Sequence, residues 1–203
     1  MSRKKIFILC GCLFFLQLLT MSAYSCVGRI LTISLNNSMD QQIIGHILSV
    51  YITERTGTTI EFTEAADVNG CQQAVNKGDA DIFINYLGVA SANLKDEKTG
   101  ENPQETFAII KEYYLQNYKM VWLKPFGYKG PLAKGGKAGG QGQTIAAPVT
   151  TKKVLERFPI LDRLINKLEG KIDDNTMEQL IKKATTMDPE KVAKDFLKKR
   201  NMI

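Results

Sequence analysis

The sequence predicts an α/β fold in which a parallel-rich sheet is flanked by helices. Between residues 29 and 86, three strand-like segments alternate with two helical ones. This β-α-β-α-β order is typical of an open α/β sheet with right-handed crossover connections. The chain has 203 residues, of which 44% are hydrophobic and 24% charged, ordinary values for a globular protein of one domain or two small ones.

The first strand and helix are predicted from the spacing of apolar residues. Arg29 to Leu35 carries β-branched residues in alternation, as strands do. From Gln41 to Thr56 the apolar residues recur on one helical face. Ser38 or Asp40 can cap the start of this helix, and Gly57 is placed to end it.

Two more strands and a short helix complete the alternating part. Thr58 to Thr63 predicts the second strand, and Gly70 to Gly78 predicts a short helix. Ala80 to Tyr86 is apolar along nearly its whole length, which is typical of a strand buried on both faces of a parallel sheet. Residues 91–106 are polar and predict a surface loop.

The second half begins with a helix predicted over Phe107 to Gln116 and a strand predicted over Lys119 to Leu123. Residues 127–143 then hold seven glycines among 17 residues, a flexible composition that cannot bury a core. We therefore expect a linker or loop there. Gly136-Lys137 does not make it a nucleotide-binding loop, because the earlier glycine and the following Ser or Thr of that motif are missing.

The C-terminal part is predicted to be helical. Thr151 to Phe158 forms a turn-rich segment, and the apolar stripe that follows it ends at Gly170. Asp174 or Asn175 can cap the next helix. Asp188-Pro189-Glu190 supplies the cap, the first-turn proline and the acidic residue that favour the start of a last helix. The lysines of that helix are expected to form a solvated face.

Residues 1–25 have the pattern of an export signal. Three basic residues precede an apolar run from Ile6 to Leu19, and Ala23 and Ser25 fit a cleavage site. The run is shorter than the ~20 residues of a membrane-spanning helix, although a retained anchor is the alternative. Removal of the signal leaves 24 basic and 21 acidic residues, so the net charge falls from +6 to +3. We expect a periplasmic location and, without a basic stripe interleaved with aromatics, no nucleic-acid partner.

Three states stay open for Cys26, the first residue of the exported chain. It can be free, carry a lipid anchor, or pair with Cys71. The residues before it match a lipidation signal poorly because Tyr24 is bulky. Cys26 precedes the first strand and Cys71 follows the second, so parallel strands place them at opposite ends of the sheet. A disulfide needs Cα atoms within ~7 Å, so only a folded-back arm can join the two.

No catalytic constellation is present in the sequence, so we expect neither an enzyme nor a cofactor or metal site. His46, the single histidine, lies beside the apolar stripe of the first helix and is interpreted as structural. Asp79 and Asp81 stand at a turn and at a strand start. We expect Asp81 to accept hydrogen bonds from local backbone rather than to act as an acid or base.

Polar and aromatic residues gather instead at the carboxyl ends of the predicted strands, where open α/β folds bind ligands. Asn36 and Asn37 follow the first strand, and Tyr86 and Gly88 end the third. Gly70 opens the helix after the second strand, where free N–H groups can hold an anion. An aromatic face attracts a quaternary ammonium group by about 0.5–2 kcal/mol. These five residues are the predicted ligand site, with core packing as the alternative for Tyr86.

Four segments resemble the substrate-binding proteins of osmoprotectant ABC transporters, which take glycine betaine, choline, carnitine or proline betaine. The segments are Ser34 to Gly45, ADIFINYLG at 80–88, WLKPFGY at 122–128, and the helical stretch from Phe158 onward that includes 174–180 and 192–197. The last is the most specific, and together they cover most of residues 29–128 and 146–203. The resemblance implies a type 2 periplasmic-binding-protein fold and an ABC permease in the membrane as partner.

Members of this family close two α/β lobes on the ligand. In this chain only residues 127–143 stand where the second lobe is inserted. The resemblance therefore implies one discontinuous lobe, residues 26–126 and 144–203, joined by a glycine-rich linker in place of the second lobe.

The first lobe also departs from the family at three positions. Phe83, Asn85 and Leu87 replace a tyrosine, a glutamate and a threonine, while Asn36 and Tyr86 match. A half-site cannot surround a cation, so we expect weak binding of a quaternary-ammonium or amino-acid-like solute, or none. The expected function is that of an exported solute-binding component of an ABC transporter. The alternative is an interaction or accessory protein whose exposed cleft face binds a protein partner or, as a homodimer, a second copy of the chain.

Overall fold

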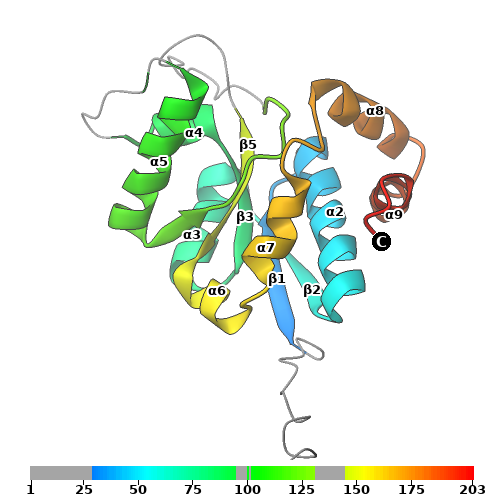
Figure 1. Cartoon of the computed structure of the whole chain (residues 1–203), viewed down its shortest axis with the longest axis horizontal. Coiled ribbons are helices and arrows are strands. Elements are labelled where there is room, and N and C mark those ends of the chain that lie inside the picture. The colour runs from blue at the N-terminus through cyan, green and yellow to red at the C-terminus, as the bar shows by residue number, and fades with distance from the viewer. Residues whose placement is uncertain (1–28, 95–99, 101, 131–144) are drawn as a thin grey trace, which may run out of the picture.

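A computed structural model describes residues 29–94, 100, 102–130 and 145–203, in which one five-stranded sheet has helices on both faces (Figure 1). The export signal, Cys26 and residues 131–144 of the glycine-rich segment lie outside the described residues. The strand order is β2-β1-β3-β5-β4. The strands are β1 (Ile30–Leu35), β2 (Thr59–Glu64), β3 (Ile82–Tyr86), β4 (Met120–Trp122) and β5 (Ala146–Thr151).

The first three strands confirm the predicted parallel arrangement. β1 pairs in parallel with β2 on one side and with β3 on the other. The crossover through α2 (Met39–Thr56) and that through α3 (Val68–Lys77) therefore run in opposite directions across the sheet. Right-handed crossovers in opposite directions place their helices on opposite faces. In Figure 1, α3 lies to the left of the sheet and α2 to the right.

β5 is a strand that the sequence does not predict, and it departs from the parallel pattern. It runs antiparallel between β3 and β4 and is buried along nearly its whole length. Its third residue, Pro148, has no N–H for the ladder and is rare in central strands. Thr151, expected to open a turn-rich segment, instead ends β5, and its hydroxyl caps α6 (Lys152–Arg157).

The remaining helices follow the predicted order. They are α4 (Leu87–Ser91), α5 (Pro103–Tyr118), α7 (Leu161–Ile165), the 3₁₀ helix η1 (Asn166–Leu168), α8 (Asp174–Ala184) and α9 (Pro189–Lys199). α5 starts four residues before its predicted start, because Asn102 caps it and Pro103 suits its first turn. Asp173 caps α8, in place of the predicted Asp174 or Asn175, whereas Asp188 caps α9 as predicted.

The helix ends of the first half differ from the prediction in two details. Ser38 occupies the N-cap position of α2 without a side-chain capping bond. Asp67 caps α3, which starts at Val68, two residues before the predicted start. Gly57 ends α2 as predicted, in the left-handed conformation (φ 69°) that glycine adopts at little cost. The apolar stripe alone therefore does not set where these helices begin and end, because the capping hydrogen bonds contribute as well.

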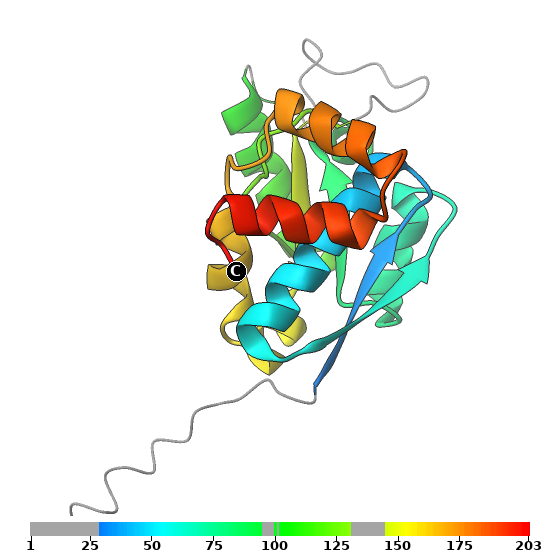
Figure 2. The same ribbon diagram turned by 90° about the vertical axis from the view of Figure 1, so that its right-hand side faces the viewer.

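The two C-terminal helices cover the outer side of α2. Both α8 and α9 pack on α2, and Figure 2 shows α9 lying across it. The side of α9 that carries Val192, Ala193, Phe196 and Leu197 is buried, as predicted. Its lysines are exposed, in agreement with the expected solvated face.

His46 lies half-buried on α2 and has a structural role. Its ring meets the Phe62 ring edge-on, with 5.0 Å between centroids. Burial lowers the pKa of His46 below its ordinary value of 6.5, and the carboxylates of Asp188 and Glu190 at the start of α9 oppose this only in part. The native protein therefore favours the neutral imidazole more than the unfolded chain does.

The lowered pKa of His46 predicts a loss of stability in mildly acidic solution. Below pH 6.5 the unfolded chain binds a proton at His46 that the native chain does not, so the stability present above that pH is lost as the pH falls through the native pKa. His46→Gln should flatten the profile of unfolding free energy between about pH 7.5 and 5.5, measured by urea titration. An equally steep profile in the variant would contradict this role.

Candidate functional site

The predicted ligand site lies where the carboxyl ends of β1 and β3 meet the start of α2. Asn36, directly after β1, shapes the turn into the helix. Its Oδ1 accepts hydrogen bonds from the N–H and the hydroxyl of Ser38 at 2.9 and 2.7 Å, and its carbonyl accepts one from Gln42 at 2.9 Å. This explains why the Ser38 hydroxyl does not cap α2. Asn37 is exposed beside it.

Tyr86, at the end of β3, is completely buried and joins the sheet to α2. Its hydroxyl donates to Oδ2 of Asp40 at 2.5 Å and accepts from Nε2 of Gln41 at 3.1 Å. The same Gln41 nitrogen donates to the carbonyl of Ile84 at 3.0 Å. Tyr128 donates to the Asp40 oxygen as well, at 3.4 Å. The Asp40 carboxylate thus accepts hydrogen bonds from two phenolic hydroxyls that come from different parts of the chain.

The electrostatics of this cluster keep both phenols protonated. Burial raises the pKa of Tyr86, and the negative charge of Asp40 raises it further. Burial likewise raises the pKa of Tyr128 well above its ordinary value, with Tyr86 and Asp40 adding to the shift. The two hydroxyls are therefore donors at any physiological pH.

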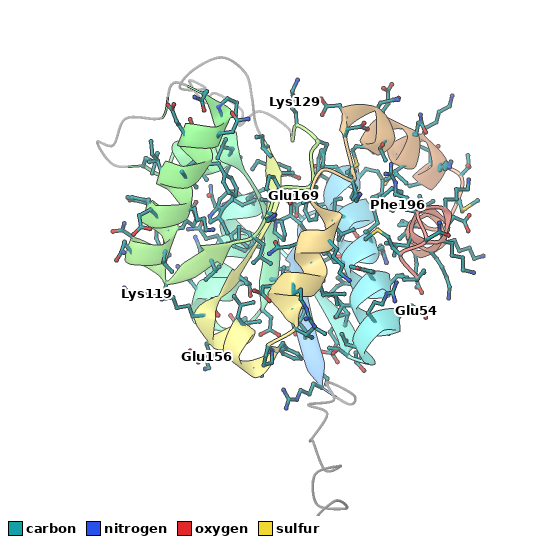
Figure 3. The ribbon with its side chains drawn as sticks, viewed as in Figure 1. Glu54, Lys119, Lys129, Glu156, Glu169 and Phe196 are labelled. Carbon is teal, nitrogen blue, oxygen red and sulfur yellow. The ribbon has the colours of Figure 1, made fainter. Side chains whose placement is uncertain are left out.

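Residues 126–130, which we call the covering segment, lie over the Tyr86 ring. A Cβ built on Gly130 would stand only 1.7 Å from Cδ1 of Tyr86, so only glycine fits here without a shift. The backbone N–H of Lys129 donates to Oδ1 of Asp174 at 2.6 Å, and Figure 3 shows Lys129 near the start of α8. The carbonyl of Tyr128 accepts from Ala146 at 3.1 Å.

The covering segment changes two interpretations of the sequence. The face of Tyr86 is closed to solvent, which favours core packing for this residue, and its role in ligand binding stays a prediction. Residues 127–130, expected to open a flexible linker, are packed against the lobe, with Tyr128 buried and Gly127 bridged to Ile172.

The two predicted glycines contribute little to the site. The N–H of Gly70, expected to be free for an anion, already donates to Oδ1 of Asp67 at 2.7 Å. That carboxylate is the cap of α3, so the helix start satisfies its own donor. Gly88 lies half-buried in the short helix α4. Of the five predicted residues, the structure brings Asn36 and Tyr86 to the ends of adjacent strands.

Asn85, which stands where the resembling family has a glutamate, is a structural residue. It is completely buried, and its Oδ1 accepts from the N–H of Tyr86 at 2.8 Å. Its Nδ2 donates to the hydroxyl of Tyr114 at 3.3 Å, and that hydroxyl donates to Oε1 of Gln72 at 3.0 Å. This side chain therefore points into a buried network that links β3 to α3 and α5.

Sequence reasoning missed three members of the site. Asp40 was expected only to cap α2, and Gln41 and Tyr128 were assigned no role at the site. Gln41 is completely buried, and its Oε1 has no hydrogen-bond partner among the described residues. Tyr128 ends the WLKPFGY segment, and the resemblance of that segment to the family was the sequence signal for this residue.

Three further questions that the sequence left open concern the cysteines, a metal site and a membrane-spanning helix. Cys71 is buried and forms no disulfide among the described residues, and burial raises the pKa of its thiol. The possible states of Cys26 stay predictions. Within the described ranges, no group of three or more His, Cys, Asp and Glu side chains is arranged to hold a metal ion. No helix in the part of the chain that the structure describes is long and apolar enough to cross a membrane.

The sheet order, the helices on both faces and the site at the carboxyl ends of β1 and β3 define a lobe of the periplasmic-binding-protein class. The sequence model of one family, the substrate-binding domain of ABC-type glycine betaine transport systems, matches residues 30–133 and 112–199. These spans cover most of the chain, and the protein belongs to this family. The predicted resemblance and fold class are therefore confirmed, and the family is one of solute-binding proteins rather than of enzymes.

Solved structures show the same fold at low sequence identity. A protein described as a glycine betaine/carnitine/choline ABC transporter is 16% identical with a TM-score of 0.75, covering 85% of this chain and 99% of that one. Apo YehZ from Escherichia coli is 15% identical with a TM-score of 0.70 and the same coverage of both chains. Lactococcal OpuAC, closed on glycine betaine, is 12% identical with a TM-score of 0.51, covering 85% of this chain and 96% of that one.

Proposed function

We propose that this protein is an exported solute-binding component of an ABC transporter for a quaternary-ammonium solute. The observation that carries the proposal is the carboxylate of Asp40, held by Tyr86 and Tyr128 at the carboxyl edge of the sheet. The negative charge of a carboxylate attracts a quaternary ammonium group. Family members of known structure bind glycine betaine or choline, which supports the same ligand class here.

The same geometry predicts weak binding by a single copy. The described residues form one lobe, and the covering segment closes the face of Tyr86. A cation at Asp40 would be partly exposed to water, where one ion pair gives little net free energy. We therefore propose a dissociation constant on the order of 1 mM or weaker for choline and glycine betaine.

The export signal and the expected partners complete the proposal. Residues 1–25 have the composition of a signal, which supports delivery to the periplasm, where an ABC permease would receive the solute. Two copies facing each other would supply the second side of the cleft that one lobe lacks. Sedimentation equilibrium with and without choline tests that homodimer. If two copies close around the solute, the measured molecular mass should be larger when choline is present.

Isothermal titration calorimetry with choline and glycine betaine tests the proposed site. Asp40→Asn keeps the hydrogen-bond acceptor but removes the charge, and should weaken binding at least about tenfold. Asp195→Asn is the matched control, because Asp195 is an exposed carboxylate on α9 at a distance from the cluster. Equal affinity in all three proteins would refute the site, and micromolar binding by a monomer would refute the half-site argument.

A further inference from the structure

A pocket lies toward the end of α2 that is far from the Asp40 cluster. α2 starts at the cluster and runs 18 residues, about 27 Å, to the other end of the sheet. There, the end of α2, the segment after α7 and the end of α9 lie side by side (Figure 2). They enclose an open cavity of about 550 Å³, a volume in the range of small-ligand sites.

The pocket is lined by four cations and no acidic side chain. They are Arg55, Lys167, Lys171 and Arg200, which come from three separate parts of the chain. The described residues contain four ion pairs within 4.0 Å, at Lys124, Lys129, Arg157 and Lys194, and none of them involves a pocket cation. Excess positive charge therefore converges here without a carboxylate to neutralise it at contact distance.

Nearby negative charge is weaker than this excess. Asp173 is close enough for Arg200 to contribute to lowering its pKa, but it does not line the pocket. The carboxyl ends of α2 and α9 also point here, and each carries only about half an elementary negative charge. Four full positive charges exceed these contributions.

Two of the cations are held in place before any ligand arrives. The guanidinium of Arg55 donates through Nε to the carbonyl of Met202 at 2.7 Å, and Nη2 donates to the same oxygen. The guanidinium of Arg200 lies over the ring of Phe196, 5.0 Å from its centroid, on the part of α9 seen in Figure 3. Ordered donors lose less entropy on binding than free side chains do.

The backbone beside Lys171 is also fixed. Gly170 takes the left-handed conformation, φ 61°, and its N–H donates to the carbonyl of Pro125 at 3.2 Å. The N–H of Ile172 donates to the carbonyl of Phe126 at 3.1 Å. The turn that carries Lys171 to the pocket is thus tied on both sides to the segment after β4.

Tyr51 adds a hydroxyl donor to the lining of the pocket. Its side chain is 1% exposed and lines the pocket, yet no described residue forms a hydrogen bond with its hydroxyl. The hydroxyl is open to the pocket, where it can donate to water or to a ligand. Burial raises the pKa of Tyr51, so the hydroxyl remains a donor.

We propose that this pocket binds a phosphate-type oxyanion, to which Arg55 and Arg200 present guanidinium donors, Lys167 and Lys171 ammonium groups, and Tyr51 its hydroxyl. Guanidinium groups and hydroxyls match the several acceptor oxygens of such an anion. The anion can be free in solution or belong to a lipid headgroup. The site is independent of the solute site at Asp40.

The first experiment is an NMR titration of the purified protein with inorganic phosphate at about 0.15 M ionic strength, which screens non-specific attraction. The amide signals of Lys171 and Asn201 should shift and saturate. Tyr51→Phe should weaken binding about threefold or more, and Lys171→Gln about fivefold or more. Lys191→Gln is the matched control, since it removes the same charge from the other end of α9 and should change the affinity less than about twofold.

Vesicles distinguish the two sources of the anion. Cosedimentation with phosphatidylglycerol vesicles, compared with phosphatidylcholine vesicles, measures binding to a headgroup. Loss of that binding in Lys171→Gln but not in Lys191→Gln assigns a lipid source, and saturable binding of inorganic phosphate alone assigns a free one. If neither probe binds, or if Lys171→Gln and Lys191→Gln weaken binding equally, the site is an adventitious ion only and the proposal is overturned.

Discussion

Replacing Tyr114 with alanine is expected to destabilise the protein by about 4 kcal/mol, the usual cost of removing a buried aromatic ring. Tyr114 on α5 is completely buried. Its ring centroid lies 5.4 Å from that of Trp122 and 5.1 Å from that of Tyr118, so the alanine variant leaves a cavity among aromatic rings. In a chain of this size the loss corresponds to a fall in melting temperature of roughly 8–16 °C.

A milder variant separates ring packing from hydrogen bonding. Tyr114→Phe keeps the ring but removes the hydroxyl that joins Asn85, Asn93 and Gln72. We expect a loss of about 1–3 kcal/mol, because buried amides then lose a partner. Tyr113→Ala is the control, since the neighbouring ring is only half-buried and should cost less than Tyr114→Ala. Urea unfolding with an unchanged m-value measures all three, and a Phe variant as stable as the native protein would refute the network's contribution.

The parallel part of the fold could be predicted because local and global preferences agree there. In β1, α2 and β3 the apolar spacing matches the burial, and Gly57 ends α2 where the pattern stops. β5 could not be predicted, because Pro148 and two alanines argue against a central strand and a glycine-rich stretch precedes it. Its place between β3 and β4 is decided by long-range pairing, which no local pattern records.

The site was predicted less well than the fold, for a related reason. Strand ends are local features, so Asn36 and Tyr86 were placed at adjacent ends correctly. What Tyr86 contacts depends on Tyr128 and Gly130, more than 40 residues further along the chain. A residue that looks like a ligand contact in the sequence can therefore be buried when a distant segment folds over it.

Asp81 is a second case in which distant partners decide the role of a residue, because the sequence predicted hydrogen bonds to local backbone. Oδ2 does accept from a backbone N–H, but from that of Thr32 in β1, 49 residues earlier, at 2.9 Å, and not from local backbone. Oδ1 also pairs with the guanidinium of Arg157 at the end of α6, a partner that the sequence does not indicate. The Asp81 side chain is only 14% exposed, so water replaces these partners poorly.

Asp81→Ala is therefore expected to cost about 2–3 kcal/mol, because it leaves a strand N–H and a guanidinium without their acceptor. Asp81→Asn should lose less, since the amide oxygen still accepts from Thr32 while the ion pair with Arg157 is gone. Asp79→Ala is the matched control two residues earlier, where the carboxylate is exposed and a change within about 0.5 kcal/mol is expected. Urea midpoints measure the series. Asp81 has buried partners, whereas Asp79 is exposed. If Asp81→Ala and Asp79→Ala are equally stable, those partners contribute nothing measurable, and the bond to Thr32 does not hold β3 to β1.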